Sequence, residues 1–422
     1  MLQAVARALP PEEPPEPPGD GAGGGPAAAF GRGVDTRLHD AAYAGKTAQV
    51  ENLLLELGGG NSLLERRDRA GDTALHLACL GGHLRLAARL IEECPRLVDA
   101  QDNQGWTALH YAASTGNTGV AEMLLDAGAR IVQDKDGNSP AHEAASKGRA
   151  ACGQLIVERA AAKAASGRAA GRDADLTAVV SAPNAFGETA LMLAASRGIP
   201  PMCVALVEHG ASMEQRNHSG WCALHHAANA GRPAVVALLA QRGANVDAHD
   251  KQGETALHKA CTKDSQFCVR NLCDAGADVR LLSADGRSPL HCCVANKKAS
   301  CALQLLGAAA TAGVVRYIVV ARDRRGRTAL DLAVRAANKP IAILLKETVA
   351  AMIVSVRAAR TTTAVPQRLT SGAVDRCKRA SGVTWLRGRP RERNARSRSS
   401  ACSAVARAAS STRSTAARAT SA

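Results

Sequence analysis

Short blocks of apolar residues alternate with polar turns along most of the chain, and two kinds of block recur in pairs. The first kind carries Ala-Leu followed closely by a small pair, as at residues 108–113. The second kind carries adjacent large apolar residues, as at Leu124-Leu125. Apolar positions three and four residues apart are typical of one face of a helix, so each pair of blocks predicts two short helices. Gly116 and Gly128 stand where these helices should end.

One short motif marks each pair of predicted helices. It reads Gly-Asp-Thr-Ala-Leu-His at residues 71–76 and returns with ends at residues 110, 142, 192, 225, 258, 291 and 331, after a degenerate copy that ends at His39. The ends are 37, 34, 32, 50, 33, 33, 33 and 40 residues apart. Because one such unit cannot bury its apolar face alone, stacked units must form the core. We therefore predict an all-α repeat solenoid of about nine units over residues 34–348.

The motif and its period resemble the ankyrin repeat family, in which Thr-Pro-Leu-His-x-Ala recurs about every 33 residues. The resemblance implies stacked helix-turn-helix units with β-hairpin fingers. It also implies that partners dock on the fingers and on the first helices, which form the concave surface.

Candidate protein-binding residues therefore follow each turn glycine or lie near the end of a first helix. They are Asp72, Trp106, Asn138, Glu188, Trp221, Glu254, Arg287 and Arg327 at the fingers, and Arg197 and Lys263 on the helices. Two of the three tryptophans share one finger position, and tryptophan is enriched at interface hot spots. The alternative is that each tryptophan packs only on the neighbouring finger. Arginines and lysines at the C-terminal fingers predict a partner with acidic residues there.

The histidine of the motif recurs once in most units, which favours a structural role. The resemblance implies that it joins neighbouring repeats through hydrogen bonds to the motif threonine and to backbone. Met192 and Asp331 replace it in two units. His226, beside the repeat histidine of its unit, is expected to be exposed.

Most of the 13 cysteines stand at small or apolar helix positions, as Cys79 and Cys261 do, and we expect them to be buried apolar residues. His76 with Cys79 has a spacing that suits a metal on a helix. A zinc site needs about four converging ligands, however, so we predict no metal and no other cofactor.

Composition agrees with the repeat interpretation, since 46% of residues are hydrophobic but only 2% are aromatic. Helices that stack through alanine and leucine need few aromatic residues. No apolar run reaches the ~18 residues of a membrane span, and no signal-peptide core is evident. We therefore expect a soluble intracellular protein, cytoplasmic or nuclear.

Several segments depart from the repeat. Residues 1–33 are rich in Pro, Gly and Glu and are expected to be disordered. An insertion at 160–183 should begin by prolonging a helix, and residues 314–320 suggest a longer hairpin arm. Asp264, Lys297 and Ala337 replace the glycine that ends the first helix, so the last three repeats are expected to be less regular.

Residues 349–422 form a basic tail rich in Arg, Ser, Ala and Thr, which is expected to be disordered. From Arg357 onward only Asp375 and Glu392 are acidic, so most of the formal net charge of +15 lies there and the solenoid is nearly neutral. Three interpretations remain: a nucleic-acid-binding or nuclear-import segment, a nonspecific solvated tail, or GC-rich DNA read out of frame.

The function indicated is a non-catalytic, monomeric scaffold or adaptor that binds another protein or peptide on the concave surface. One alternative is a nuclear or nucleic-acid-associated adaptor that uses the basic tail. Another is the targeting region of a truncated ankyrin-containing enzyme. No phosphate-binding glycine loop and no nucleophile-elbow motif occurs, so the chain as written is not expected to be an enzyme.

Overall fold

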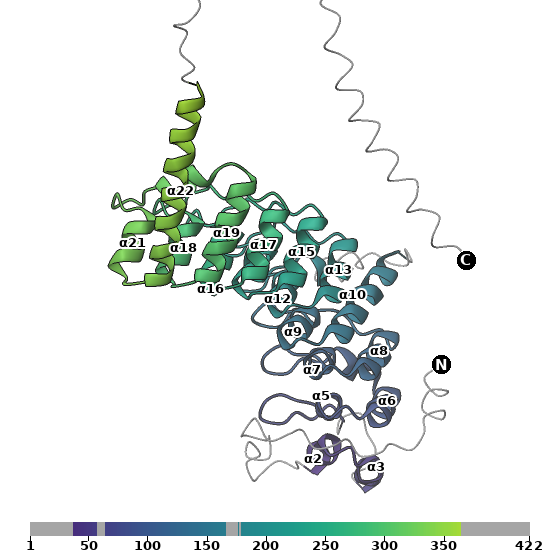
Figure 1. The fold of residues 1–422 in the computed structure, drawn as a ribbon. Helices are drawn as coiled ribbons and strands as arrows, with labels where there is room; N and C mark the ends of the chain where they lie inside the picture. The colour runs from purple at the N-terminus through teal and green to yellow at the C-terminus, as the bar shows by residue number, and fades with distance from the viewer. Residues whose placement is uncertain (1–36, 57–63, 166–175, 177–178, 364–422) are drawn as a thin grey trace, which may run out of the picture. The chain divides into compact units, whose positions relative to one another are not determined.

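The computed structural model describes residues 37–56, 64–165, 176 and 179–363, which form successive pairs of short helices (Figure 1). Predictions for residues 1–33, for 166–175 and 177–178 of the insertion, and for the tail beyond residue 363 fall outside the described residues. The last helix continues past residue 348, where the solenoid was expected to end, to Thr363.

Each pair has an inner first helix and an outer second helix. The first helices are α2 (Arg37–Tyr43), α5 (Ala74–Leu80), α7 (Ala108–Thr115), α9 (Pro140–Lys147), α12 (Ala190–Arg197), α14 (Ala223–Asn229), α16 (Ala256–Lys263), α18 (Pro289–Ala295) and α21 (Ala329–Arg335). The second helices are α3 (Thr47–Glu56), α6 (Leu84–Glu93), α8 (Thr118–Asp126), α10 (Ala150–Ala165), α13 (Pro200–Glu208), α15 (Pro233–Gln241), α17 (Gln266–Asp274), α19 (Ala299–Thr311) and α22 (Lys339–Thr363). A 3₁₀ turn, η2 (Pro95–Asp99), follows α6, and α20 (Val315–Val320) follows α19. The predicted all-α repeat solenoid is confirmed.

The first helices begin with a shared capping arrangement. Thr107, for example, has an extended backbone, its hydroxyl lies 2.9 Å from His110 Nδ1, and its backbone N–H donates to the same nitrogen at 3.1 Å. Such a cap satisfies backbone donors that the helix itself leaves unpaired. The motif Thr or Ser and the residue three positions later therefore define where the helix starts.

Left-handed backbone follows most of the first helices. Gly116 and Gly148 have φ of 86° and 77°, and Asp264, Lys297 and Ala337 adopt the same region with φ of 67°, 59° and 52°. The last three repeats thus keep the backbone of the others, contrary to the irregularity expected. The replacement changes strain rather than shape, since a non-glycine residue in this region costs roughly 1–2 kcal/mol.

Leucines of the first helices form the core between repeats, as predicted. Leu75, Leu109, Leu224, Leu257 and Leu290 are all at most 1% exposed, and only Leu330 of the last repeat is half-buried. Each second helix adds at least one buried apolar residue, such as Leu124 or Leu239. Neighbouring first helices contact one another in order along the chain (Figure 1).

The fingers are tight turns rather than the two-stranded β-hairpins expected. Asp102 N–H donates to Trp106 O at 2.9 Å and Gly105 N–H to Asp102 O at 3.1 Å, which closes the loop within five residues. In the described ranges the single isolated β-bridge joins His249 and Thr255. Adjacent fingers are linked by backbone hydrogen bonds, as from Lys135 N–H to Gln104 O at 3.0 Å.

The two interruptions of the period differ from one another. Helix α10 extends to Ala165, which confirms that the insertion begins by prolonging a helix. The prediction of a hairpin arm at residues 314–320 is wrong, because this segment forms helix α20. Ile318 and Val319 are 1% and 5% exposed, and consecutive residues of a strand would instead point to opposite faces. None of the described helices is long and apolar enough to span a bilayer.

Candidate functional site

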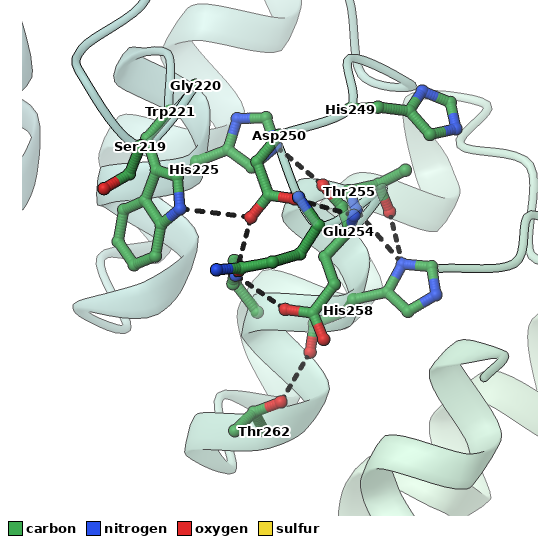
Figure 2. A network of polar contacts seen from close by, with 12 residues as sticks. Ser219, Gly220, Trp221, His225, His249, Asp250, Glu254, Thr255, His258 and Thr262 are labelled. Atoms are coloured by element: carbon green, nitrogen blue, oxygen red, sulfur yellow. Dashed lines mark hydrogen bonds and ion pairs between the residues drawn. The ribbon is translucent and has the colours of Figure 1, made fainter. Parts of the chain in front are cut away.

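Each repeat histidine joins two neighbouring repeats, as the resemblance implied. His258 Nδ1 accepts the backbone N–H of Thr255 at 3.2 Å, and its Nε2 lies 3.1 Å from Arg287 O in the next finger. Figure 2 shows this histidine beside Thr255. The same two contacts recur at His76, His110, His142, His225 and His291. Only a neutral ring with its proton on Nε2 makes both hydrogen bonds, so the structural role is confirmed.

Burial keeps these histidines neutral. It lowers the pKa of His76, His142 and His258 to about 4, against the opposing effect of the carbonyl that each ring contacts. Both ring nitrogens are occupied, which leaves neither for a metal or for proton transfer to a substrate. In the part of the chain that the structure describes, no group of three or more His, Cys, Asp or Glu could hold a metal ion.

His226 was expected to be exposed, and this prediction is wrong, because it is 8% exposed. Its ring lies edge-on to Trp221 with the ring centres 5.2 Å apart, and its Nε2 is 3.2 Å from Asn217 Nδ2. The Glu188 carboxylate approaches the same nitrogen at 3.8 Å. Side chains of two adjacent fingers therefore cover the position that follows the repeat histidine.

The two tryptophans are half-buried, and each is anchored to the next finger. Trp221 Nε1 donates to Asp250 Oδ2 at 3.1 Å (Figure 2), and Trp106 Nε1 donates to Asp134 Oδ2 at 3.0 Å. Trp106 also packs edge-on against Tyr111 at 5.1 Å. These contacts match the packing alternative, and they leave part of each ring on the surface.

A buried lysine completes the arrangement at Trp221. Lys259 Nζ lies 2.8 Å from Asp250 Oδ2, 2.6 Å from Glu254 Oε2 and 4.6 Å from the centre of the Trp221 ring. Its side chain is 8% exposed. Burial lowers the pKa of Lys259, but hydrogen bonds to the two carboxylates outweigh it and raise the pKa overall. We call Trp221, Asp250, Glu254 and Lys259 the Trp221 cage.

The equivalent residues three repeats earlier are Trp106, Asp134, Asn138 and Glu143, which we call the Trp106 cage. Asp134 Oδ1 accepts the backbone N–H of Asn138 at 2.7 Å, while its Oδ2 accepts from Trp106. Glu143 stands where the other cage has Lys259, and it is 9% exposed. Burial raises the pKa of Glu143, Lys147 opposes this effect, and Asp134 adds to it.

The remaining predicted site residues do not converge on one site. Asp72 is buried, and burial raises its pKa to about 6. Arg327 forms paired hydrogen bonds with Asp323 at 2.9 and 2.7 Å. Arg197, Lys263 and Arg287 are exposed. Glu188 and Arg197 line one pocket together with His226, whereas the other candidates stand at separate positions along the repeats.

The cysteines of the described residues behave as predicted. All are buried except Cys273, which is half-buried. Burial raises the pKa of the Cys152 thiol to about 11 and that of Cys203 to about 12. Such thiols are poor nucleophiles, because the thiolate is the reactive form.

Sequence reasoning missed the partners of the tryptophans. Asp134, Asp250, Glu143 and Lys259 were not among the candidates, although they hold or fill the two cages. A signal was present: a charged residue follows the repeat histidine at Glu143 and Lys259, where Leu77 and Leu332 occupy that position in other repeats.

Comparison with known families agrees with the geometry. The family described as ankyrin repeats (three copies) matches residues 38–133, 168–250 and 243–314. Comparison with curated proteins gave no match. The matched ranges cover more than half of the chain and include both tryptophan fingers and the motif histidines other than His142. The chain belongs to the ankyrin repeat family.

Proposed function

We propose that the chain is a non-catalytic scaffold that binds a protein or peptide along its fingers and first helices. Ankyrin repeats are generally protein-interaction modules. The observation that carries the proposal is the pair of tryptophans, each held by an aspartate of the next finger yet partly on the surface. An aromatic side chain already fixed in place loses little entropy on binding and is a typical interface anchor.

Charge along the fingers supports a partner of mixed charge. Asp136 and Lys135 are both exposed at an early finger, whereas exposed Arg287, Arg324 and Arg325 gather at the last two fingers. A partner that places acidic residues against the late fingers would meet complementary charge. Arginines at such a rim mainly speed association and make it salt-dependent.

The absence of catalysis is part of the proposal and rests on the state of the reactive side chains. The repeat histidines from His76 to His291 use both ring nitrogens within the fold, and burial raises the pKa of thiols such as Cys152 and Cys203. These groups are therefore poorly suited to act as a base or nucleophile.

Site-specific photo-crosslinking tests where a partner binds. The full chain would carry a photoreactive phenylalanine in place of Arg287, on a finger, or of Arg270, which is also exposed but lies on outer helix α17. We expect one cellular protein to be cross-linked from position 287 and not from 270. Cross-linking from position 270 alone would place binding on the outer helices and overturn the proposal.

A further inference from the structure

The two tryptophan cages are the same structural element with one charge reversed. Trp106 and Trp221 stand just before the capping residue of repeats three and six. Each donates its indole N–H to an aspartate of the next finger. That aspartate lies four residues before the position that corresponds to the tryptophan, which is Asn138 in one case and Glu254 in the other. Asp134 corresponds to Asp250 by this contact. The residue after the next repeat histidine is Glu143 in the first cage and Lys259 in the second.

The Trp221 cage shows what this element binds. The ammonium of Lys259 contacts two carboxylates within 2.8 Å and lies over the ring of Trp221 at 4.6 Å. A cation between carboxylates and an aromatic face gains from ion pairing and from the ring quadrupole together. The chain therefore supplies its own cation in repeats six and seven.

The Trp106 cage has the carboxylates and the ring but no such cation. Glu143 is 9% exposed, and among the described residues no lysine or arginine forms an ion pair with its carboxylate, although the positive charge of Lys147 lowers its pKa. Asp134 accepts the indole N–H of Trp106 in the same cage. Tyr111, which packs against Trp106, donates its hydroxyl to Asp102 at 2.9 Å. A largely buried position is unfavourable for a carboxylate with no cation paired to it, and burial raises the pKa of Glu143.

We propose that the Trp106 cage binds a lysine side chain of a partner protein, with its ammonium between Glu143 and Asp134 and against the ring of Trp106. A lysine reaches such a site because its apolar stem spans the distance from a partner's backbone while the charge stays at the tip. This inference rests on the proposed function and adds the chemistry that one position of the groove recognises.

The first test needs no partner. Glu143→Lys should reproduce the Trp221 cage, with the new ammonium beside Asp134 and Trp106. We expect the melting temperature of the full chain to rise by about 2–4 °C. Glu158→Lys, the same charge change at an exposed position of α10, should leave it unchanged. A fall in melting temperature for Glu143→Lys alone would show that the cage does not accommodate an ammonium and would overturn the inference.

The second test uses a phage library of random dodecapeptides selected against the full chain. We expect the enriched peptides to share one lysine. A fluorescein-labelled copy should bind about tenfold or more weakly when norleucine replaces that lysine, and when the protein carries Glu143→Gln. Glu158→Gln is the matched control and should leave the affinity within about twofold.

The outcomes separate this inference from the proposed function. Enriched peptides that need no lysine, or that bind Glu143→Gln as they bind the parent, would overturn the cation site and leave the scaffold role intact. Failure to enrich any peptide, together with no cross-linking from position 287, would count against both. If spermidine displaces the labelled peptide at spermidine concentrations below the Kd of the peptide, the cage would be assigned to a small polyamine instead of a protein lysine.

Discussion

The helix pairs before the insertion, residues 37–165, and those after it, residues 179–363, form two blocks built on one repeat. The N-terminal block ends its first helices with glycine and leaves the Trp106 cage without a cation. The C-terminal block keeps Gly198 and Gly231 in its first two repeats, but its last three have Asp264, Lys297 and Ala337 at the same backbone position. Lys259 fills its Trp221 cage. The backbone hardly changes between them, so stacking determines the shape of each unit.

The difference indicates which positions are available for function. Capping residues, core leucines and repeat histidines recur in both blocks because each contacts a neighbouring repeat. The position after the repeat histidine varies from leucine to tyrosine, glutamate, histidine and lysine, although its side chain also contacts the neighbouring repeat, as Lys259 contacts Trp221. In a solenoid, where each unit contacts only its neighbours, such a position can change its chemistry without affecting distant repeats.

The largest expected effect is a loss of stability in acid, and it tests the buried histidines that both blocks share. The pKa is lowered to about 4 for His76 and His142 in one block and for His226 and His258 in the other, with burial as the first cause. Between pH 6.5 and 4 the unfolded chain binds protons that the folded chain does not. Stability should therefore fall with pH through this window, by about 2 kcal/mol per histidine at pH 5.

Urea unfolding of the full chain at pH 7 and pH 5, followed by circular dichroism, measures this loss. Asp72 acts in the opposite direction, because its pKa is raised to about 6 and its burial becomes less costly in acid. It offsets only part of the effect of four histidines. Equal midpoints at the two pH values would contradict the neutral state of these four buried rings.

The next prediction sharpens the comparison between the cages. Lys259→Met should destabilise the C-terminal block by about 3 kcal/mol, because it leaves Asp250 and Glu254 without their cation in a buried site. Glu143→Gln in the N-terminal block should be neutral or stabilising, because it removes a charge that its partial burial disfavours. The urea unfolding midpoints of the two variants measure both effects. A similar loss of stability in both variants would mean that the cages do not differ in charge balance.

The fold could be predicted because its determinants recur. The spacing of the motif, the cap at Thr107 and the bridging histidines appear in most units, so a single sequence displays each contact several times. The expectation that Asp264, Lys297 and Ala337 would disturb the repeats was wrong, because stacking imposes the left-handed backbone on residues that do not favour it.

Most of the candidate site could not be predicted, because its contacts join residues of different repeats. The bonds from Trp106 to Asp134 and from Trp221 to Asp250 depend on how far one finger reaches over the next. The burial of His226 has the same cause, since the covering side chains come from two fingers. For helix α20 the run of valines suggested a strand. The structure shows a helix instead, in which the consecutive residues Ile318 and Val319 are both buried.

The smallest expected effect concerns the left-handed residues. Lys297→Gly removes backbone strain of roughly 1–2 kcal/mol but loosens the unfolded chain by about 0.4–1 kcal/mol, so the net gain should be about 0.5–1 kcal/mol. Gly148→Ala is the mirror experiment in the N-terminal block: φ is 77°, and no heavy atom lies within 4 Å of the added Cβ. It should lose about 0.5–1 kcal/mol, because backbone strain of roughly 1–2 kcal/mol exceeds the about 0.4–1 kcal/mol gained by restricting the unfolded chain. Urea midpoints shifting in opposite directions would show that both blocks hold this backbone against local preference, whereas no shift in either would remove strain as a difference between them.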